Sequence, residues 1–176
     1  MIRVGRLPGE RWADFRGLRL EALQKEPVAF GSSYEEELVL GEEEWRRRIK
    51  NVFFAVEGGT PVGMTSLVFG DRIKTRHIAH IFSVYVRPDR RGLGLGKKML
   101  DRALAEARRR RRVVKVQLSV NPSAKAAVAL YKRAGFKVTG RAHKELKVGN
   151  RYHDLLYMEL QVGRRKMRAK RTSSIP

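Results

Sequence analysis

The stretch VRPDRRGLGLGKKMLDRALAEA, residues 86–107, decides the fold, because it joins the end of a strand to the start of a helix through a glycine-rich turn. Glycines occupy positions 92, 94 and 96, and cations flank them: Arg90, Arg91, Lys97 and Lys98. Glycine lets the backbone approach another group closely. The first N–H groups of a helix have no partner within the helix and lie at its positive end. The stretch therefore predicts a main-chain site for an anion.

Two well-known nucleotide-binding turns do not fit this sequence. The P-loop, G-x-x-x-x-G-K-[ST], needs a longer glycine spacing and a hydroxyl residue where Lys98 stands. The dinucleotide-binding turn, G-x-G-x-x-G, needs an acidic residue about 20 residues further on. Here the turn reads G-x-G-x-G, and the next predicted strand ends in Ser119-Val120-Asn121. The anion is therefore expected to belong to another kind of ligand.

The segments around this turn predict a mixed, mostly antiparallel sheet of about seven strands flanked by about four helices, which is an α/β (α+β) fold. The strands are expected at 2–7, at two places within 51–70 joined by a turn at 57–60, and at 77–86, 113–120, 136–140 and 151–161. The helices are expected within 9–27, at 42–50, from Lys97 to about 107, and at 123–135. A strand–helix–strand unit following an antiparallel meander places helices on both faces of the sheet.

Length and composition indicate one domain, residues 1–162, followed by a basic tail, residues 163–176, that is expected to be disordered. The chain of 176 residues has no cysteine, so it can form neither a disulfide nor a thiolate metal site, and no metal is expected. It also lacks an apolar run of membrane-spanning length and a signal peptide. We therefore expect a cytoplasmic protein.

The charge of the chain is strongly asymmetric. Residues 1–70 carry 10 Lys and Arg against 11 Asp and Glu, whereas residues 71–176 carry 29 against 7. A basic half of this kind attracts polyanions such as nucleic acid, a phosphorylated cofactor or an acidic membrane surface. The acidic cluster at Glu35–Glu37 and Glu42–Glu44 is interpreted as a solvated face, with attraction of a cationic amine as the alternative.

The segment RGLGLG, residues 91–96, has the form [QR]-x-x-G-x-[GA] and resembles the acetyl-CoA pyrophosphate loop of the GCN5-related N-acetyltransferases (GNAT). Three neighbours resemble the same family at the same spacing: FSVYVRP before the loop, the helix after it, and VNPSAKAAVALYKRAGF downstream. The closing RYHDLLYMEL and the early RLEALQKEPVAFGSSYEEE resemble its last strand and its first helix with the substrate loop. The resemblance covers about residues 1 to 162 and implies the GNAT fold and an acetyltransferase acting on a small-molecule or peptide amine.

The resemblance assigns the coenzyme to two backbone segments. The loop that would bind the pyrophosphate comprises Arg91, Gly92, Leu93, Gly94, Leu95, Gly96 and Lys97. The strand backbone at Val84, Tyr85 and Val86 would pair with the pantetheine arm, and a β-bulge there would open the strand away from 113–120. Asn121 either contacts the pantetheine or caps the following helix.

The resemblance also implies a general acid, Tyr131, whose hydroxyl would protonate the leaving thiolate, whereas the alternative is a tyrosine that only packs in the core. For the base we name His80, although strict alternation places it on an apolar face with Ile78, Phe82, Val84 and Val86. Other candidates for the base are Glu57, His153, Asp154 or a water chain ending at one of them.

Two positions depart from the family pattern. Many members have Asn where this chain has Ala124, and alanine cannot make the same contact with the coenzyme. The acetyltransferases that modify ribosomal-protein alanine carry a catalytic Glu where this chain has Ser119, so a peptide N-terminus is a less favoured substrate. Members of the family are commonly dimers, so a homodimer is an option. The alternative function is an RNA- or ribosome-associated protein on the same scaffold, with nucleic acid bound by the basic half.

Overall fold

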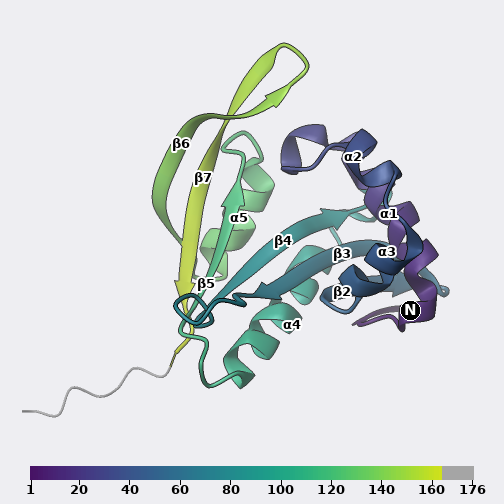
Figure 1. The fold of residues 1–176 in the computed structure, drawn as a ribbon, viewed down its shortest axis with the longest axis horizontal. Helices are drawn as coiled ribbons and strands as arrows, with labels where there is room; N and C mark the ends of the chain where they lie inside the picture. The colour runs from purple at the N-terminus through teal and green to yellow at the C-terminus, as the bar shows by residue number, and fades with distance from the viewer. Residues whose placement is uncertain (164–176) are drawn as a thin grey trace, which may run out of the picture.

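A single seven-stranded sheet organises the chain, with the strand order β1-β2-β3-β4-β5-β7-β6 (Figure 1). The computed structural model describes residues 1–163, so the predicted tail, 163–176, lies outside them apart from Gly163. The strands are β1 (Ile2–Gly5), β2 (Val52–Glu57), β3 (Thr60–Phe69), β4 (Ile78–Val86), β5 (Lys115–Val120), β6 (Lys137–Val148) and β7 (Arg151–Gln161). Within this sheet β4 and β5 run parallel, and the other neighbours are antiparallel. The predicted mixed sheet is confirmed.

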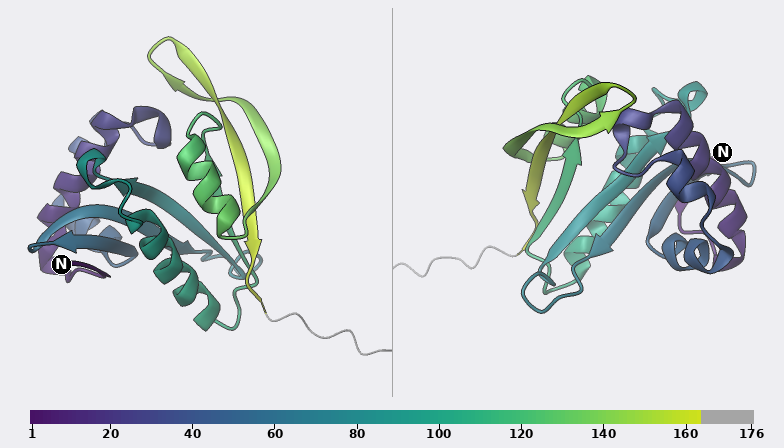
Figure 2. Two further views of the ribbon diagram at one scale, coloured as in Figure 1. Left: turned by 180° about the vertical axis from the view of Figure 1, so that it is seen from behind. Right: turned by 45° about the horizontal axis from the view of Figure 1, so that its top comes forward.

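Helices cover both faces of the sheet. They are α1 (Trp12–Lys25), α2 (Tyr34–Leu38), α3 (Glu42–Ile49), α4 (Leu95–Arg109) and α5 (Lys125–Arg133). Helices α4 and α5 lie on one face, and α1 and α3 lie on the other (Figures 1 and 2). None of these helices, all within residues 1–163, is long and apolar enough to cross a membrane.

Five α-helices form where about four were predicted, and the additional one is α2. Its first turn is fixed by a capping box, in which Ser33 Oγ accepts from the Glu36 N–H at 3.2 Å and Glu36 Oε2 accepts from the Ser33 N–H at 2.7 Å. The Ser-x-x-Glu pattern that marks such a box is present in the sequence. Periodicity alone does not reveal α2, because five residues make little more than one turn.

Two hydrophobic clusters fill the space between the sheet and the two helix layers. On one face, Phe15 of α1 contacts Trp45 of α3 and Phe54 of β2 edge to face, at centroid distances of 5.3 and 5.7 Å. On the other face, Leu100 and Leu104 of α4 pack on the central strands. Trp45 and Phe54 are fully buried, so the core begins directly behind the substrate loop predicted from the sequence.

The last two strands form a long hairpin, which corrects the prediction that one of them is limited to residues 136–140. β6 runs to Val148 and pairs with β7 up to Arg151, through a turn at Gly149 and Asn150. The hairpin projects past α5 toward the segment that precedes α2 (Figure 1). The outer half of β6 is mostly polar and exposed, so it lacks the apolar alternation that predicts a strand.

Candidate active site

A gap in the sheet opens between β4 and β5. The two strands pair over three residues only, Ile78–His80 with Lys115–Gln117, although β4 continues to Val86 and β5 to Val120. Beyond His80 the strands diverge (Figure 1). The edge of β4 that faces the gap therefore presents backbone N–H and C=O groups without a strand partner. The divergence expected from the sequence is confirmed, and it begins upstream of Val84.

A β-bulge in β4 accompanies the gap. The β3–β4 register shifts between Met64 and Ser66, and Ser83 has a positive φ of 56°. A bulge rotates the strand, so side-chain directions before and after it do not follow one alternation. Ile81 before the bulge and Val84 after it both belong to the cluster under α4 and α5.

The predicted face that joins His80 with Val84 and Val86 is therefore wrong. The His80 ring stacks on Phe82, with 5.8 Å between the centroids, and Phe82 is half exposed. Burial, and secondarily the charge of Lys115, lowers the pKa of His80. His80 is not among the residues that line the cavity described next.

A cavity of about 590 Å³ begins at the gap and extends over the face that carries α1. At the gap it is lined by Ile81, Phe82, Ser83, Val84, Ser119, Val120, Asn121, Ala124, Ala127 and Tyr131. At its far end it is lined by residues of α1, α3 and the segment before α2, and Leu146 and Leu155 of the hairpin complete it. Its volume lies in the range typical of small-molecule sites.

Tyr131 brings a protonated hydroxyl to this cavity. It lies on α5, is 5% exposed, and packs edge to face on Phe136 at 6.0 Å. Within the described residues its hydroxyl makes no hydrogen bond. Burial raises the pKa of Tyr131, so the hydroxyl keeps its proton at neutral pH. The Tyr131 ring therefore packs in the core and the residue also lines the cavity, while its role as general acid stays a prediction.

Each glycine of the turn before α4 has its own structural reason. Gly92 and Gly94 have φ values of 80° and 71°, a conformation that glycine adopts without steric cost. Gly96 lies in the first turn of α4, where an added Cβ would lie 3.4 Å from Leu130 of α5. The glycines therefore shape the turn and bring α4 close to the helix that carries Tyr131.

The backbone amides of this turn are free to bind an anion. From Gly92 to Lys97 no N–H group donates to an acceptor within the described chain, and the next amide, that of Lys98, donates to Gly94 O at 3.0 Å. Free amides at the first turn of a helix of fifteen residues form an anion site. The main-chain site predicted from the sequence has the required geometry.

The flanking cations are held by carboxylates instead of pointing freely at that site. Arg90 pairs with Glu57 and Lys97 pairs with Asp101, each at 2.6 Å. Arg91 pairs with Glu26 at 2.6 Å, and its Nε donates to Val86 O at 3.1 Å. Lys98 is exposed. These side chains stabilise the turn and add positive charge around it.

Tyr85 and Asn121 have structural partners in addition to their predicted roles. The Tyr85 hydroxyl donates to Glu21 on α1 at 2.9 Å, so this side chain points away from α4. Asn121 is 6% exposed and lines the cavity, and its Oδ1 accepts from both the N–H and the hydroxyl of Ser123, at 2.8 and 2.6 Å. Asn121 therefore fixes the turn before α5, but it is not the predicted helix cap, because α5 begins at Lys125 with Ala124 as its N-cap and has no side-chain cap.

The carboxylates considered as bases are already engaged. Glu57 pairs with Arg90. Asp154 accepts from the Lys144 N–H at 2.9 Å and from Arg141, and these contacts lower the pKa of Asp154 to about 2. A carboxylate with so low a pKa is a weak base.

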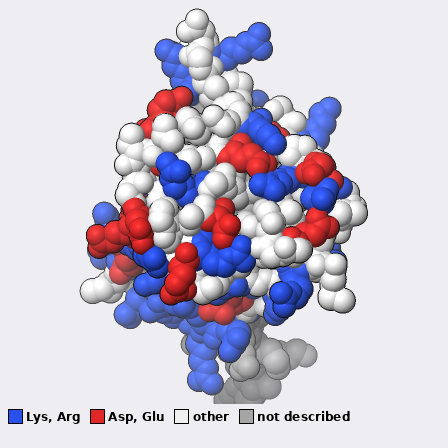
Figure 3. Space-filling view, turned by 90° about the vertical axis from the view of Figure 1, so that its right-hand side faces the viewer, with Lys and Arg blue, Asp and Glu red and all other residues white. Residues whose placement is uncertain are grey.

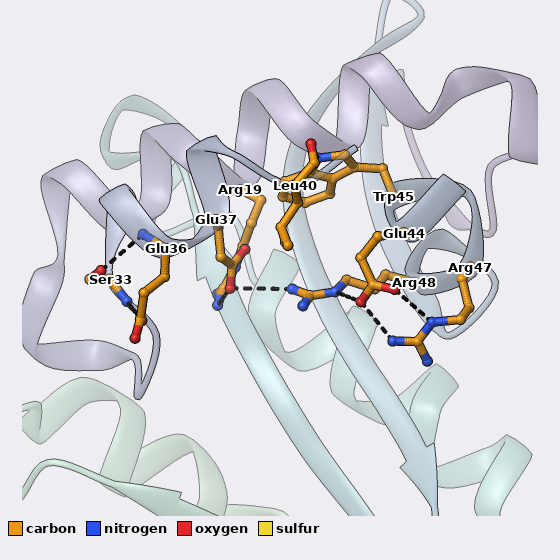
Figure 4. A network of polar contacts seen from close by, with 9 residues as sticks. All are labelled: Arg19, Ser33, Glu36, Glu37, Leu40, Glu44, Trp45, Arg47 and Arg48. Atoms are coloured by element: carbon orange, nitrogen blue, oxygen red, sulfur yellow. Dashed lines mark hydrogen bonds and ion pairs between the residues drawn. The ribbon is translucent and has the colours of Figure 1, made fainter. Parts of the chain in front are cut away.

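A buried ion pair at the far end of the cavity corrects the interpretation of the acidic cluster as a solvated face at Glu37, whereas Glu35, Glu36, Glu42 and Glu43 are exposed as expected. Glu37 is 2% exposed and accepts from Arg19 Nε and Nη2 at 2.9 and 2.7 Å (Figure 4). Arg48 of α3 lies 3.4 Å from Glu37 and also pairs with Glu44 at 2.5 Å. Burial raises the pKa of Glu37, but the hydrogen bonds and charge of Arg19, with Ser32 and Arg48, together outweigh burial and lower the pKa overall.

Sequence reasoning missed Arg19, Glu37 and Arg48 as site residues. Glu37 looks like its exposed neighbours Glu35 and Glu36 in the sequence. The available signal is the position of Arg19 among the buried residues Phe15, Leu18 and Leu23 of α1, since an arginine on the apolar side of a helix needs a buried partner.

Comparison with known proteins gives one consistent result. Residues 14–136 match the model of the acetyltransferase (GNAT) family. The L-amino acid N-acyltransferase MnaT of Escherichia coli is 34% identical over 116 residues, which are 65% of this chain and 66% of that protein. Overall, the chain spans less than two thirds of the length of the curated relatives it matches.

Solved structures share the fold. An acetyltransferase of the GNAT family from Streptococcus pneumoniae superimposes with a TM-score of 0.81 at 22% identity, covering 93% of this chain and all of that one. The Salmonella typhimurium protein yncA, solved with its cofactor acetyl-CoA, gives a TM-score of 0.76 at 22% identity, covering 92% and 94%. The predicted GNAT fold is confirmed.

Proposed function

This chain belongs to the acetyltransferase (GNAT) family, and we propose that it transfers an acetyl group from acetyl-CoA to a primary amine. The observation that carries the proposal is the gap between β4 and β5, which has Tyr131 on one side, together with the free amides of the turn that follows β4 and begins α4. The relatives named as N-acyl- and N-acetyltransferases support the same activity.

The residues present fit acetyl-CoA. The unpaired amides from Gly92 to Lys97 suit the diphosphate, because they supply several donors at a positive helix end. The unpaired edge of β4 suits the amide-bearing pantetheine arm, which has the donors and acceptors of an extended peptide. Val86 O is the exception on this edge, since Arg91 already donates to it. Because position 124 is alanine instead of the asparagine of many family members, one side-chain contact with the coenzyme is lost. The two main-chain sites, at the turn and at the edge of β4, stay intact.

Bound acetyl-CoA supplies a thioester that a neutral amine attacks. A β4 N–H next to the bulge at Ser83 would donate a hydrogen bond to the thioester carbonyl. The Tyr131 hydroxyl would donate its proton to the departing sulfur. Leu146 and Leu155 of the hairpin exclude water from the far side of the cavity. The proton of the amine leaves through water, with His80 as the base candidate nearest to the gap along β4.

Two measurements together test this function. One is calorimetric titration with acetyl-CoA, and the other is release of free thiol with a panel of primary amines. Saturable binding at one site per chain and amine-dependent release of thiol are expected. A chain that binds no acetyl-CoA does not have this activity. A cytoplasmic location and a homodimer stay predictions from the sequence.

We expect Gly94→Val to weaken acetyl-CoA binding about tenfold or more, measured by the same titration. At a φ of 71° a β-branched side chain is strained by about 1–3 kcal/mol, which the turn relieves by moving its amides. The matched control is Gly149→Val, at a φ of 57° in the hairpin turn, where an added Cβ also meets open space. This control keeps its affinity for acetyl-CoA. Equal effects of both variants on affinity would contradict a role of the turn in binding.

The alternative function, binding of RNA, is favoured by one surface. The basic end comprises Arg72, Lys74 and Arg76 of the β3–β4 loop with Arg108–Arg112 at the end of α4 and directly after it, all exposed. The two segments meet where the Arg110 guanidinium lies 3.8 Å above the Phe69 ring. Figure 3 shows acids and bases mixed over the face of α1 and α3, and basic residues prevailing at the lower end of the view.

If the basic end binds RNA, the affinity of the whole chain for a single-stranded oligonucleotide should fall linearly with the logarithm of salt concentration. The change Arg111→Glu with Arg112→Glu should make that dependence shallower by about 2 in slope. Fluorescence anisotropy measures both. Absence of binding at low salt would eliminate this function and leave acetyl transfer untouched.

A further inference from the structure

Arg19, which lines the cavity, has one buried nitrogen without an acceptor within the described residues. Arg19 is 6% exposed and uses Nε and Nη2 to hold Glu37. Its third nitrogen, Nη1, is buried and makes no hydrogen bond within the described residues. A buried guanidinium nitrogen without a partner is costly, because it loses water and gains nothing in exchange. Arg19 lines the cavity, so a ligand there can supply the missing acceptor.

Arg19 is fixed in this orientation. Its Cζ lies 4.6 Å from the centroid of the Phe30 ring, and Glu37 holds its other two nitrogens in the bidentate geometry of a strong pair. Glu37 is held in turn by Arg48 (Figure 4). The guanidinium cannot turn Nη1 toward Glu37 without breaking a bidentate pair. The guanidinium that carries the open nitrogen is therefore held in one orientation.

The charges at this end of the cavity do not cancel. Arg19, Arg47 and Arg48 line it, and the carboxylates that pair with them are Glu37 and Glu44. Three cations facing two carboxylates leave one positive charge. In a partly enclosed site an uncompensated charge of this kind favours a ligand with one negative charge.

We propose that the acetyl acceptor carries a carboxylate next to its amine, as an α-amino acid does, and that Arg19 Nη1 donates to that carboxylate. This inference rests on the proposed acetyl transfer. The amine must be neutral when it attacks, so an amino acid in its reactive form has a net charge of −1. This charge balances the one positive charge of the residues that line the cavity. A plain alkylamine leaves the positive charge unbalanced, and a diamine adds to it.

The rest of the lining defines the side chain that fits. Phe30, Val68, Phe82, Leu146 and Leu155 are apolar and line the same cavity. An uncharged, mainly apolar side chain buries surface against them. The positive wall also disfavours the ammonium form of the acceptor, so it lowers the pKa of the amine and makes a strong base less necessary.

Pairs of acceptors that differ only in the carboxylate test the inference with the unchanged chain: L-leucine against isoamylamine, and L-phenylalanine against phenethylamine. Thiol release at saturating acetyl-CoA gives kcat/KM for each. We expect the carboxylate to raise kcat/KM at least about thirtyfold, as for a buried charge-assisted contact. Equal or better use of the plain amines overturns the carboxylate site and leaves acetyl transfer standing. Release from none of the amines, with no binding of acetyl-CoA, overturns the transfer itself.

The variant Arg19→Lys tests whether Arg19 causes the preference for a carboxylate. Lysine keeps the charge beside Glu37 and removes the open Nη1, so KM for L-leucine should rise at least about tenfold with little change in kcat. KM for isoamylamine should rise much less, because this acceptor has no carboxylate for Arg19 to bind. The matched control is Arg16→Lys on the same helix, since Arg16 donates to Leu38 O at 3.1 Å outside the cavity. Equal losses for both acceptors in Arg19→Lys overturn the assignment. If Arg19→Lys does not fold, the comparison of each amino acid with its plain amine in the unchanged chain tests the inference by itself.

Discussion

Tyr131→Phe should bind acetyl-CoA like the original chain and turn over at least about a hundredfold more slowly. The ring is buried against Phe136, so phenylalanine keeps the packing and removes only the hydroxyl. Without that hydroxyl the thiolate leaves unprotonated. The measurement is single-turnover release of thiol, with calorimetry for acetyl-CoA affinity and thermal unfolding for stability.

The control for this variant is Tyr152→Phe, because Tyr152 is exposed on the hairpin and outside the cavity. It should turn over at the original rate. Burial raises the pKa of Tyr131, so the acid form persists above the ordinary tyrosine pKa of about 10. Activity should therefore show no alkaline loss from Tyr131 below about pH 10. A normal rate in Tyr131→Phe would leave Tyr131 as a packing residue only.

Glu37→Ala should lower the free energy of unfolding by about 3–5 kcal/mol, because it leaves the Arg19 guanidinium buried without its counter-charge. Denaturant unfolding followed by circular dichroism measures the change. The matched control is Glu35→Ala on the same short helix, an exposed position whose change should stay within about 0.5 kcal/mol. Equal stability of the two variants would show that the Arg19–Glu37 ion pair makes no net contribution to the free energy of unfolding.

The same ion pair sets a pH dependence. The pKa of Glu37 is lower in the folded chain than the ordinary value of 4.5, so its contribution is fully present above that value. It is lost as the pH falls through the lowered pKa. The difference in stability between the original chain and Glu37→Ala should therefore shrink in acid and stay constant from about pH 6 to 8.

A double variant separates stability from recognition. Replacing Arg19 and Glu37 together with methionine removes both buried charges, and such replacements are often neutral or stabilising. We expect this variant to be more stable than Glu37→Ala and to lose the preference for L-leucine over isoamylamine. Loss of the preference in a stable chain would assign it to Arg19, and its retention would exclude that role.

The local parts of the site could be predicted from the sequence. The glycine spacing and the flanking cations of residues 90–98 reveal the anion-binding turn, and the structure places free amides there. These properties depend on backbone conformation and on helix ends, which neighbouring residues determine. Tyr131 followed from the family resemblance together with its position on the last predicted helix.

The remainder depends on contacts between distant segments. Arg19 and Glu37 lie 18 residues apart on two helices, so nothing local distinguishes Glu37 from the exposed Glu35 and Glu36. The direction of the β4 side chains changes at Ser83, which no alternation pattern foretells.

The sequence by itself determined the order of the strands and of the helices other than α2, and it determined the turn with free amides before α4, because both follow from patterns along the chain. Only the tertiary structure decided where β4 leaves β5, which carboxylate neutralises Arg19 and which of its nitrogens stays open. Those outcomes depend on burial, and burial is set by the packing of α1, α2 and the hairpin around one cavity.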